Sequence, residues 1–359
     1  MRHICGRGYS SLARLGCFSN SRNTCSSNSV VLALLVHPVS CIPLTNDPVS
    51  LKRRCNRSTV FRFVNLKCAK DSRNMKIFLF FPFLPLIISG QFSFTRKHKE
   101  RYCAREDQRS WSYHGYTNGP TNWPRLFPTC AGNKQSPVDI RTQKVKVDAE
   151  LSDLRFEGYD TPVTNALVTN NGETIRITFE DQVRRFISID NKEYVLQQFH
   201  FHWGTAKHPG AEHTINGFRP TLEIHFVHSN GNSTAVVGTL YEVNSKNNPA
   251  FWPIVKVLPE VKYKDLSARI NTPFTLSSLL PKNRNFYRYM GSLTTPNCQE
   301  NVIWSVMQDI QNIGDQQLQY FLKLYSVEER YKSRECHITG NYRPLQRLNG
   351  RIIYGSTHM

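Results

Sequence analysis

Apolar and polar positions alternate in short runs from about residue 111 onward, and this pattern predicts β-strands separated by turns. The clearest runs cover residues 174–179, 185–189, 196–203, 221–227 and 235–243. Turn signals rich in Asn, Asp and Gly lie between them, at residues 170–172, 190–191 and 230–232. Helical periodicity is scarce, and residues 315–325 give the best candidate. The pattern predicts one mainly β domain over residues 111–354.

Two of the predicted strands carry three histidines that can meet. Successive side chains of a strand point to opposite faces, so His200 and His202 share one face of their strand. By the same rule, His225 shares a face with Glu223. If the two strands are antiparallel neighbours, the three imidazoles converge. Three imidazoles on rigid strands, with no fourth protein ligand, are the composition of a catalytic zinc site with an open position. From the pattern alone, a row of solvated histidines is the competing interpretation.

The overall charge suggests a basic protein, but its distribution changes that interpretation. Lys and Arg number 46 against 27 Asp and Glu, an excess that suggests nucleic-acid or membrane partners. Residues 1–100 hold 16 of the basic and only 3 of the acidic residues. The excess therefore belongs mainly to the N-terminal third, and we expect no nucleic-acid partner for the folded part.

Residues 1–74 do not have the pattern of a globular domain. No acidic residue precedes Asp47, and six of the ten cysteines lie here without metal-ligand spacing. A transit peptide, a disordered tail and a spurious extension upstream of the true start are the competing interpretations.

Residues 75–90 favour the last of these, because they have the layout of a secretory signal peptide. Lys76 precedes an apolar stretch over residues 77–88, which the small residues Ser89 and Gly90 follow. We expect the functional product to start at Met75, with cleavage near Gly90 and export from the cell. A membrane partner is expected only if residues 77–88 remain as an uncleaved anchor. A basic lead-in over residues 91–110 precedes the domain, and a polar tail over residues 355–359 follows it.

Several motifs in the predicted domain resemble those of the α-class carbonic anhydrases of the secreted type. They are QSPVDI at 135–140, QFHFHWG at 198–204, AEHTINGFRPTLEIHFVH at 211–228, AVVG at 235–238, GSLTTP at 291–296 and NYRPLQRLNGR at 341–351. The resemblance implies the family fold, a large twisted and mostly antiparallel β-sheet with a few short helices.

The resemblance also implies an activity, the reversible hydration of CO₂ to bicarbonate and a proton. Zn²⁺ on the three histidines would hold a hydroxide that attacks CO₂, so the partners are CO₂, water and bicarbonate. Groups that orient the ligand imidazoles are implied to be Gln198, Glu223 and the backbone carbonyl of Asn341. Thr294 is implied to pass a proton to Glu212, and Thr295 to contact bicarbonate. An apolar wall that receives CO₂ is implied to comprise Val227, Val236, Leu293, Val302 and Trp304.

One position departs from the fastest members of this family. Glu173 stands where those enzymes carry a histidine that shuttles protons to solvent. An exposed Glu has a pKa of about 4.3, which makes it a poor acceptor from a group that titrates near 7. Arg176 adds a charge to the same rim, and Tyr113 and Asn171 match residues that organise water there. We expect an active enzyme that is slower than the fastest members.

The resemblance further implies a disulfide between Cys130 and Cys298, as in secreted members. Cys103–Cys336 is a possible second bridge, and Asn232 begins a glycosylation sequon. Two other functions compete with the enzyme: a catalytically silent extracellular binding module and a structural matrix protein. Neither is favoured, because no ligand histidine is missing and acidic runs or Gly-rich repeats are absent from the sequence.

Overall fold

The computed structural model describes residues 29–36, 60–67, 76–81, 84–89, 110–115, 117–148, 151, 154–331 and 336–356. The chain divides into two compact units, residues 1–94 and 95–359. In the first unit, two pairs of strands are antiparallel. They are β1 (Ser29–Val36) with β2 (Val60–Lys67), and β3 (Lys76–Phe81) with β4 (Leu84–Ser89). The boundaries predicted for the extension, the signal-like segment and the lead-in remain predictions.

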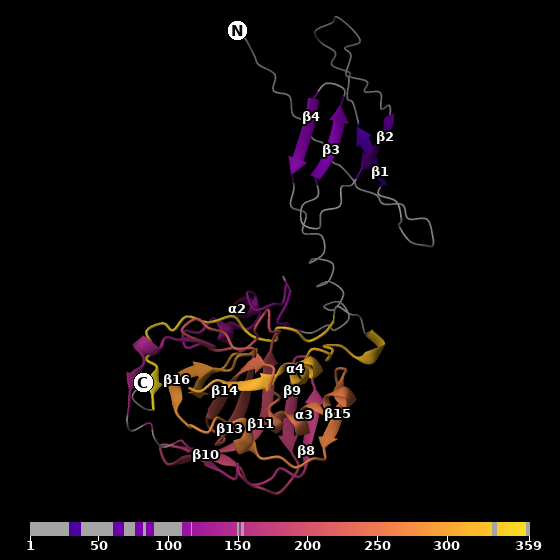
Figure 1. The fold of residues 1–359 in the computed structure, drawn as a ribbon. Helices are drawn as coiled ribbons and strands as arrows, with labels where there is room; N and C mark the ends of the chain where they lie inside the picture. Colours follow the sequence, from indigo (N-terminus) through magenta and orange to yellow (C-terminus); the bar gives the residue numbers. More distant parts are fainter. Residues whose placement is uncertain are drawn as a thin grey trace, which may run out of the picture. The chain divides into compact units, whose positions relative to one another are not determined.

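The second unit is built on a 13-stranded sheet with the order β15-β8-β9-β11-β13-β14-β17-β16-β19-β6 (Figure 1). Strands β7, β10 and β18 pair alongside this path. The strands of the path are β6 (Lys146–Val147), β8 (Ala166–Asn170), β9 (Ile175–Phe179), β11 (Lys192–Trp203), β13 (Leu222–Ser229), β14 (Thr234–Asn244), β15 (Ser267–Ile270), β16 (Phe286–Ser292), β17 (Glu300–Met307) and β19 (Tyr354–Gly355). Those alongside it are β7 (Arg155–Glu157), β10 (Phe186–Ile189) and β18 (Gln311–Gly314).

Most neighbouring strands of this sheet are antiparallel. The parallel pairs are β14 with β17, β14 with β18, and β19 with β6. A separate parallel pair joins β5 (Asp139–Ile140) to β12 (Thr214–Ile215). The predicted fold class, a mainly β domain on a large and mostly antiparallel sheet, is confirmed.

The helices are few and short, as expected. The α-helices are α2 (Trp123–Leu126), α3 (Trp252–Val255) and α4 (Asp315–Phe321). The 3₁₀ turns are η1 (Pro128–Ala131), η2 (Thr142–Lys144), η4 (Pro249–Phe251), η5 (Leu258–Val261), η6 (Leu276–Leu279) and η7 (Glu329–Tyr331). No helix in the described part of the chain is long and apolar enough to cross a membrane.

Two predicted elements differ from the observed ones by four residues at one end, whereas the ends of the other predicted strands agree to within two residues. The helix predicted over residues 315–325 ends at Phe321, because the backbone N–H of Tyr325 donates to the Lys262 carbonyl instead of continuing the helix. Strand β11 begins at Lys192 rather than 196, because a tight turn folds it back onto β10. Asp190 and Asn191 form that turn with φ of 51° and 57°, the left-handed region that such hairpin turns require.

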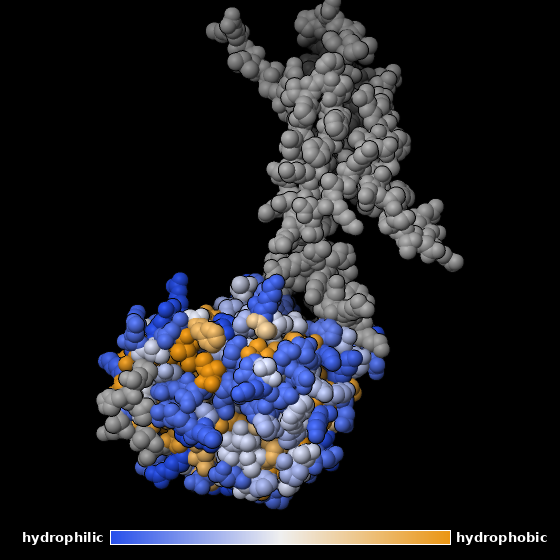
Figure 2. All heavy atoms as spheres, in the orientation of Figure 1, coloured by the Kyte–Doolittle hydropathy of each residue, from blue (hydrophilic) through white to orange (hydrophobic). Residues whose placement is uncertain are grey.

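The sheet separates an apolar core from the functional face. On β11, Phe199, Phe201 and Trp203 are fully buried in the larger apolar cluster. The alternate residues His200 and His202 therefore point to the other face. The face of the domain that Figure 2 shows is mostly hydrophilic, with smaller apolar patches between the hydrophilic residues.

A buried histidine outside the candidate site gives a prediction about acid stability. The ring of His228 lies 2.6 Å from the hydroxyl of Tyr159, and burial lowers its pKa from 6.5 to about 3. The unfolded state therefore binds a proton that the folded state does not, so stability present above pH 6.5 is lost as the pH falls toward 3. Between these two pH values, we expect His228 to lower the free energy of unfolding by about 1.4 kcal/mol for each unit by which the pH falls.

Urea unfolding of the wild type and His228→Gln between pH 6.5 and pH 4 measures this contribution. Glutamine can still bond to Tyr159 but does not titrate, so the variant should have a shallower pH dependence. Equal slopes for the two proteins would refute the prediction.

Candidate metal centre

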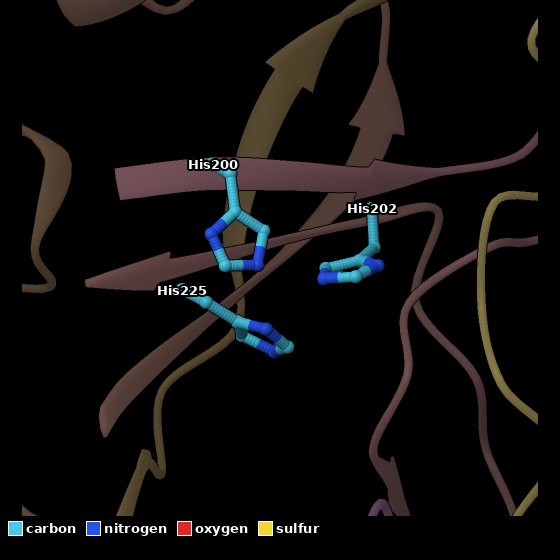
Figure 3. Close-up of side chains that lie close together, drawn as sticks. All are labelled: His200, His202 and His225. Atoms are coloured by element: carbon cyan, nitrogen blue, oxygen red, sulfur yellow. The ribbon is translucent and has the colours of Figure 1, made fainter. Parts of the chain in front are cut away.

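The register of two central strands places the three predicted histidines together. In the antiparallel pair β11–β13, His200 is directly opposite His225, and His202 is opposite Glu223. The ring centroids lie 5.0 Å apart for His200–His202, 5.3 Å for His200–His225 and 4.4 Å for His202–His225. Figure 3 shows the three rings turned toward one another, two from one strand and one from its neighbour. One ring nitrogen from each lies within 4.8 Å of the other two.

A hydrogen bond fixes each ring through the nitrogen that faces away from this point. His200 Nδ1 lies 2.9 Å from Gln198 Oε1, and His202 Nδ1 lies 2.8 Å from the Asn341 carbonyl. His225 uses its other nitrogen, with Nε2 2.7 Å from Glu223 Oε1. These three acceptors set the tautomers, as the outer partners of metal-bound histidines do.

The remaining nitrogens have the character of metal ligands. His202 Nε2 is buried and has no hydrogen-bond partner among the described residues. Leaving a buried polar atom without a partner costs about 1–3 kcal/mol unless a ligand satisfies it. Three neutral imidazoles that converge in this way fit Zn²⁺, which binds histidine nitrogens and keeps a coordination position for water in catalytic sites.

The electrostatics favour the neutral form of two of the ligands, His200 and His202. Burial lowers the pKa of His200 well below its ordinary value, and the charges of His202, His225 and Arg176 lower it further. Burial also lowers the pKa of His202, although the charge of Glu212 opposes that shift. A histidine must be deprotonated to bind a metal, so these shifts favour binding.

Glu223 supplies the negative charge behind the histidines. Burial alone would raise its pKa, but the charges of His213 and His225 and their hydrogen bonds hold it well below the ordinary value. The carboxylate also accepts the backbone N–H groups of Glu212 and His213, each at 2.8 Å. A charge-assisted network of this kind fixes the orientation of the His225 ring.

His213 extends the hydrogen-bond network of Glu223, although the motif that contains His213 predicted no role for it. Its Nδ1 lies 2.7 Å from Glu223 Oε1, and its Nε2 lies 2.7 Å from the Tyr289 hydroxyl. The Tyr289 hydroxyl in turn lies 2.7 Å from Ser136 Oγ. In the sequence, His213 directly follows Glu212 within the motif at residues 211–228, so that motif could have pointed to it. Tyr289 lies outside the recognised motifs, and no sequence pattern links it to His213.

Glu212 is held with one oxygen available. Its Oε1 accepts the backbone N–H of Arg343 at 2.7 Å, whereas Oε2 is buried, has no hydrogen-bond partner among the described residues and lies 4.0 Å from His225 Nδ1. Thr294 is also buried, at 5% exposure, and Thr295 is half-buried. The available carboxylate oxygen is compatible with the proton relay predicted for Thr294 and Glu212, which stays a prediction.

The five predicted wall residues lie in one apolar cluster. Val236, Val302 and Trp304 are buried in it, and Val227 and Leu293 pack against it. The Trp304 ring lies 4.8 Å from the ring of His225. The apolar cluster therefore reaches the histidines, where it can receive an uncharged substrate.

The predicted rim residues surround Glu173. The backbone N–H of Glu173 donates to Asn171 Oδ1 at 2.9 Å, and its carbonyl accepts from Asn341 Nδ2 at 2.9 Å. Arg176 is exposed and directly opposite His200 in the β9–β11 pair. The Tyr113 ring lies 6.5 Å from that of His202, and burial, then the charges of Glu212 and Glu173, raise its pKa.

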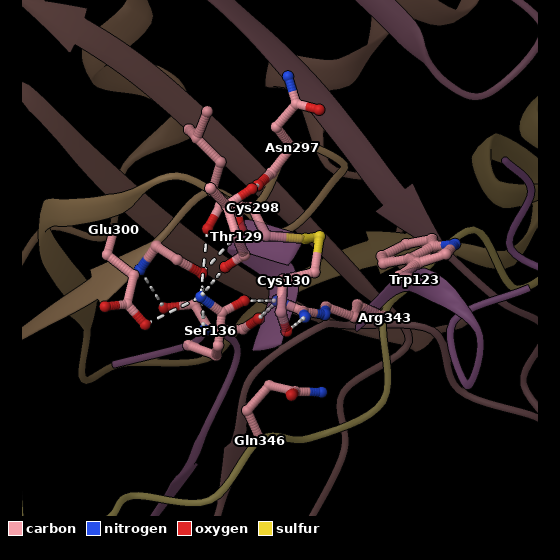
Figure 4. The surroundings of a disulfide bond; sticks show 12 residues. Trp123, Thr129, Cys130, Ser136, Asn297, Cys298, Glu300, Arg343 and Gln346 are labelled. Carbon is pink, nitrogen blue, oxygen red and sulfur yellow. Dashed lines mark hydrogen bonds between the residues drawn. A yellow bond between two sulfur atoms is a disulfide. The ribbon is translucent and has the colours of Figure 1, made fainter. Parts of the chain in front are cut away.

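A disulfide holds the segment that bears Thr294. Cys130 and Cys298 are bonded across 168 residues, as expected (Figure 4). Beside them, buried Arg343 donates to Gln135 Oε1 at 2.8 Å and to the carbonyls of Ser136 and Cys130. Burial lowers the pKa of Arg343 to about 10, still well above neutral pH.

The other predicted modification sites are only partly described. Cys336 is buried and disulfide-bonded, but Cys103, its predicted partner, lies outside the described residues. Asn232 is exposed in the turn between β13 and β14. That position is accessible to a glycan, and its glycosylation stays a prediction.

Comparisons with known proteins agree with this geometry. The sequence model of the eukaryotic-type carbonic anhydrase family matches residues 118–357. Carbonic anhydrase 6 of Canis lupus familiaris is 33% identical over 259 residues, which cover 68% of this chain and 79% of the relative. Carbonic anhydrase 6 of Homo sapiens is 32% identical, with 68% and 82% covered. Carbonic anhydrase 7 of Mus musculus is 32% identical, with 68% and 97% covered.

Proposed function

The chain belongs to the eukaryotic-type carbonic anhydrase family, and from this premise we propose that it hydrates CO₂ reversibly at a Zn²⁺ held by His200, His202 and His225. The chain is a carbonate dehydratase, a lyase. The observation that supports the zinc proposal is the convergence of three imidazoles whose outer nitrogens are already bonded. When bound, the metal would supply Lewis acidity, which makes water a nucleophile near neutral pH.

The residues behind the ligands hold each imidazole in the tautomer that binds a metal. Gln198, Glu223 and the Asn341 carbonyl each accept a ring N–H, so the nitrogens toward the shared point carry lone pairs. Neutral ligands leave the positive charge of a divalent metal largely undiminished. Glu223 provides a compensating charge one hydrogen bond away.

Glu212 and Thr294 would control the proton on the reacting oxygen. We infer that Thr294 donates its hydroxyl proton to Glu212 Oε2, the buried oxygen that has no other hydrogen-bond partner among the described residues. With its own proton committed, the Thr294 oxygen can only accept. A reacting group must then donate a proton to it, which selects water or bicarbonate over ligands without a proton.

The apolar wall would bind CO₂ without competing chemistry. Val236, Val302 and Trp304 offer no donor at the site, since the Trp304 indole N–H donates to the Ser292 carbonyl at 2.9 Å. CO₂ would make van der Waals contacts with this wall. It would form no hydrogen bond there that could hold it at a distance from the metal. Thr295, beside the relay, is a candidate contact for bicarbonate.

Stopped-flow CO₂ hydration, measured together with metal analysis, tests the proposal. The purified protein should contain about one zinc per chain. A chelator should remove both the zinc and the activity, and added Zn²⁺ should restore them. Activity that survives complete metal removal would refute the zinc proposal. A metal-loaded protein without hydration activity would favour the binding-module or matrix alternative.

Glu173 is proposed to limit turnover, which gives a second prediction. A glutamate has an ordinary pKa of about 4.3, which makes it a poor acceptor of a proton from a group that titrates near neutral pH. Glu173→His is expected to raise kcat at low buffer concentration by about 10-fold or more, because imidazole shuttling contributes 10²–10⁴-fold in favourable cases. The wild type should gain activity from added imidazole, and the variant should gain less.

A matched control is Glu157→His, which places a histidine on the exposed strand β7 outside the rim. It should leave buffer-limited turnover unchanged. An unchanged kcat in Glu173→His would show that proton transfer through this position is not limiting.

We also propose that the domain is secreted. The buried Cys130–Cys298 disulfide supports an oxidising compartment. Mass spectrometry of the native protein tests this: the N-terminus should lie near Gly90, and a glycan should be present on Asn232. Peptides from residues 1–70 in the mature protein would contradict it.

A further inference from the structure

A cavity of about 370 Å³ lies in the carbonic anhydrase domain, and none of the predicted site residues lines it. Its floor is apolar. Val138 and Ile353 are 1% and 4% exposed, and Leu348 packs against the same cluster. An aliphatic group that enters the cavity would therefore be removed from water, which favours its binding.

The walls of this cavity are positively charged. Arg141, Lys144, Lys146 and Arg351 line it, with Asp139 as the single carboxylate. Asp139 is fully engaged: it accepts from the Thr214 hydroxyl at 2.6 Å and the Gly217 N–H at 2.8 Å, and it pairs with Arg141.

Among the described residues, Lys144 and Lys146 lack a paired carboxylate. Neither forms an ion pair in this part of the chain, and both are exposed. Arg351 forms no ion pair there either: it donates to the carbonyls of Leu348, Met290, Gln135 and Arg347, and the charge of Glu300 acts on it. The two lysines therefore present positive charge beside an apolar floor, which attracts anions with an apolar part.

The cavity lies at an edge of the main sheet. Lys146, which lines it, belongs to β6, the end strand of that sheet. Ile352 also lines it and is 40% exposed, one of seven large hydrophobic residues that are exposed in the described part of the chain. A sheet edge with an exposed apolar side chain beside it can receive an extended segment of a partner protein.

We propose that this surface, defined by Lys144, Lys146, Arg351 and Ile352 around the cavity, binds an acidic segment of a partner protein. Carboxylates of the segment pair with the lysines, and an aliphatic side chain enters the cavity. A second copy of the domain is disfavoured, because residues 101–359 carry 30 basic against 24 acidic residues and would present a surface of the same sign. The proposal does not depend on the metal or on the reaction.

Fluorescence polarisation with a labelled peptide of about ten alternating Glu and Leu residues tests the proposal on the full chain. We expect saturable binding that raised salt weakens and that the same peptide with Gln for Glu loses. The double variant Lys144→Glu/Lys146→Glu should weaken binding by more than about 10-fold, and Ile352→Ser should weaken it less. CO₂ hydration should be unchanged in both variants.

Lys256→Glu is the matched control, because it makes the same charge change at an exposed lysine after α3, outside the cavity. It should bind the peptide as the wild type does. Equal weakening by this control, equal binding of the Gln peptide, or no binding up to about 1 mM peptide would overturn the proposal. Displacement of the peptide by an equal concentration of octanoate would also overturn it, in favour of a small-molecule site.

Discussion

Replacing His202 by alanine is expected to remove the metal and to lower the rate of CO₂ hydration by more than about 100-fold. Loss of an outer partner of a metal ligand already costs 10–100-fold, and His202 is proposed to bind the metal itself. Its Nε2 is buried and has no hydrogen-bond partner among the described residues, which leaves it available for the metal. The bulk of the domain should stay folded, because the ring faces the site and not the larger apolar cluster.

Two measurements check this result: the zinc content of the variant, by elemental mass spectrometry, and its rate of CO₂ hydration, by stopped flow. His208→Ala provides the control, since His208 is an exposed histidine outside the triad. It should keep both zinc and activity. A His202→Ala protein that retains stoichiometric zinc would show that the metal is held elsewhere, whatever its activity.

Removing the Cys130–Cys298 disulfide is expected to lower the stability of the domain strongly. The bond between Cys130 and Cys298 closes a loop of 168 residues. Chain entropy alone assigns such a loop roughly 5 kcal/mol, and measured losses for native disulfides are about 2–5 kcal/mol. We expect Cys130→Ser/Cys298→Ser to lower the free energy of unfolding by about this amount.

The same change should also affect the site. Cys298 N–H donates to the Thr295 carbonyl at 2.6 Å, so the disulfide constrains the segment that carries Thr294 and Thr295. Arg343, which donates to the Cys130 carbonyl, also holds Glu212 through its backbone N–H. We expect a lower kcat in the folded double variant, with zinc retained.

Urea unfolding of the wild type, the double variant and the reduced wild type measures the stability term. The reduced wild type should be at least as unstable as the double variant, because reduction also breaks the disulfide of Cys336. A loss smaller than about 1 kcal/mol would show that packing around Trp123 and Arg343 holds this region without the bond.

The alternation of apolar and polar residues is enough to predict the β character of the domain and the shared face of His200 and His202. Both follow from a local rule, because a strand repeats every two residues whatever it pairs with. The motifs around the histidines extended this to a family and to a set of expected residues. Element ends were less well determined: α4 stops early because Tyr325 is bonded to Lys262, a contact with a distant segment.

Only the tertiary structure decided which groups share a site. That β11 and β13 pair antiparallel with His200 opposite His225 is a matter of register, and no local pattern specifies register between separate strands. The roles of His213, Tyr289 and Arg343 also come from long-range contacts. The same reason applies to the cavity beside β6: its cations come from residues near 141–146 and near 351, and folding alone places them around one apolar floor.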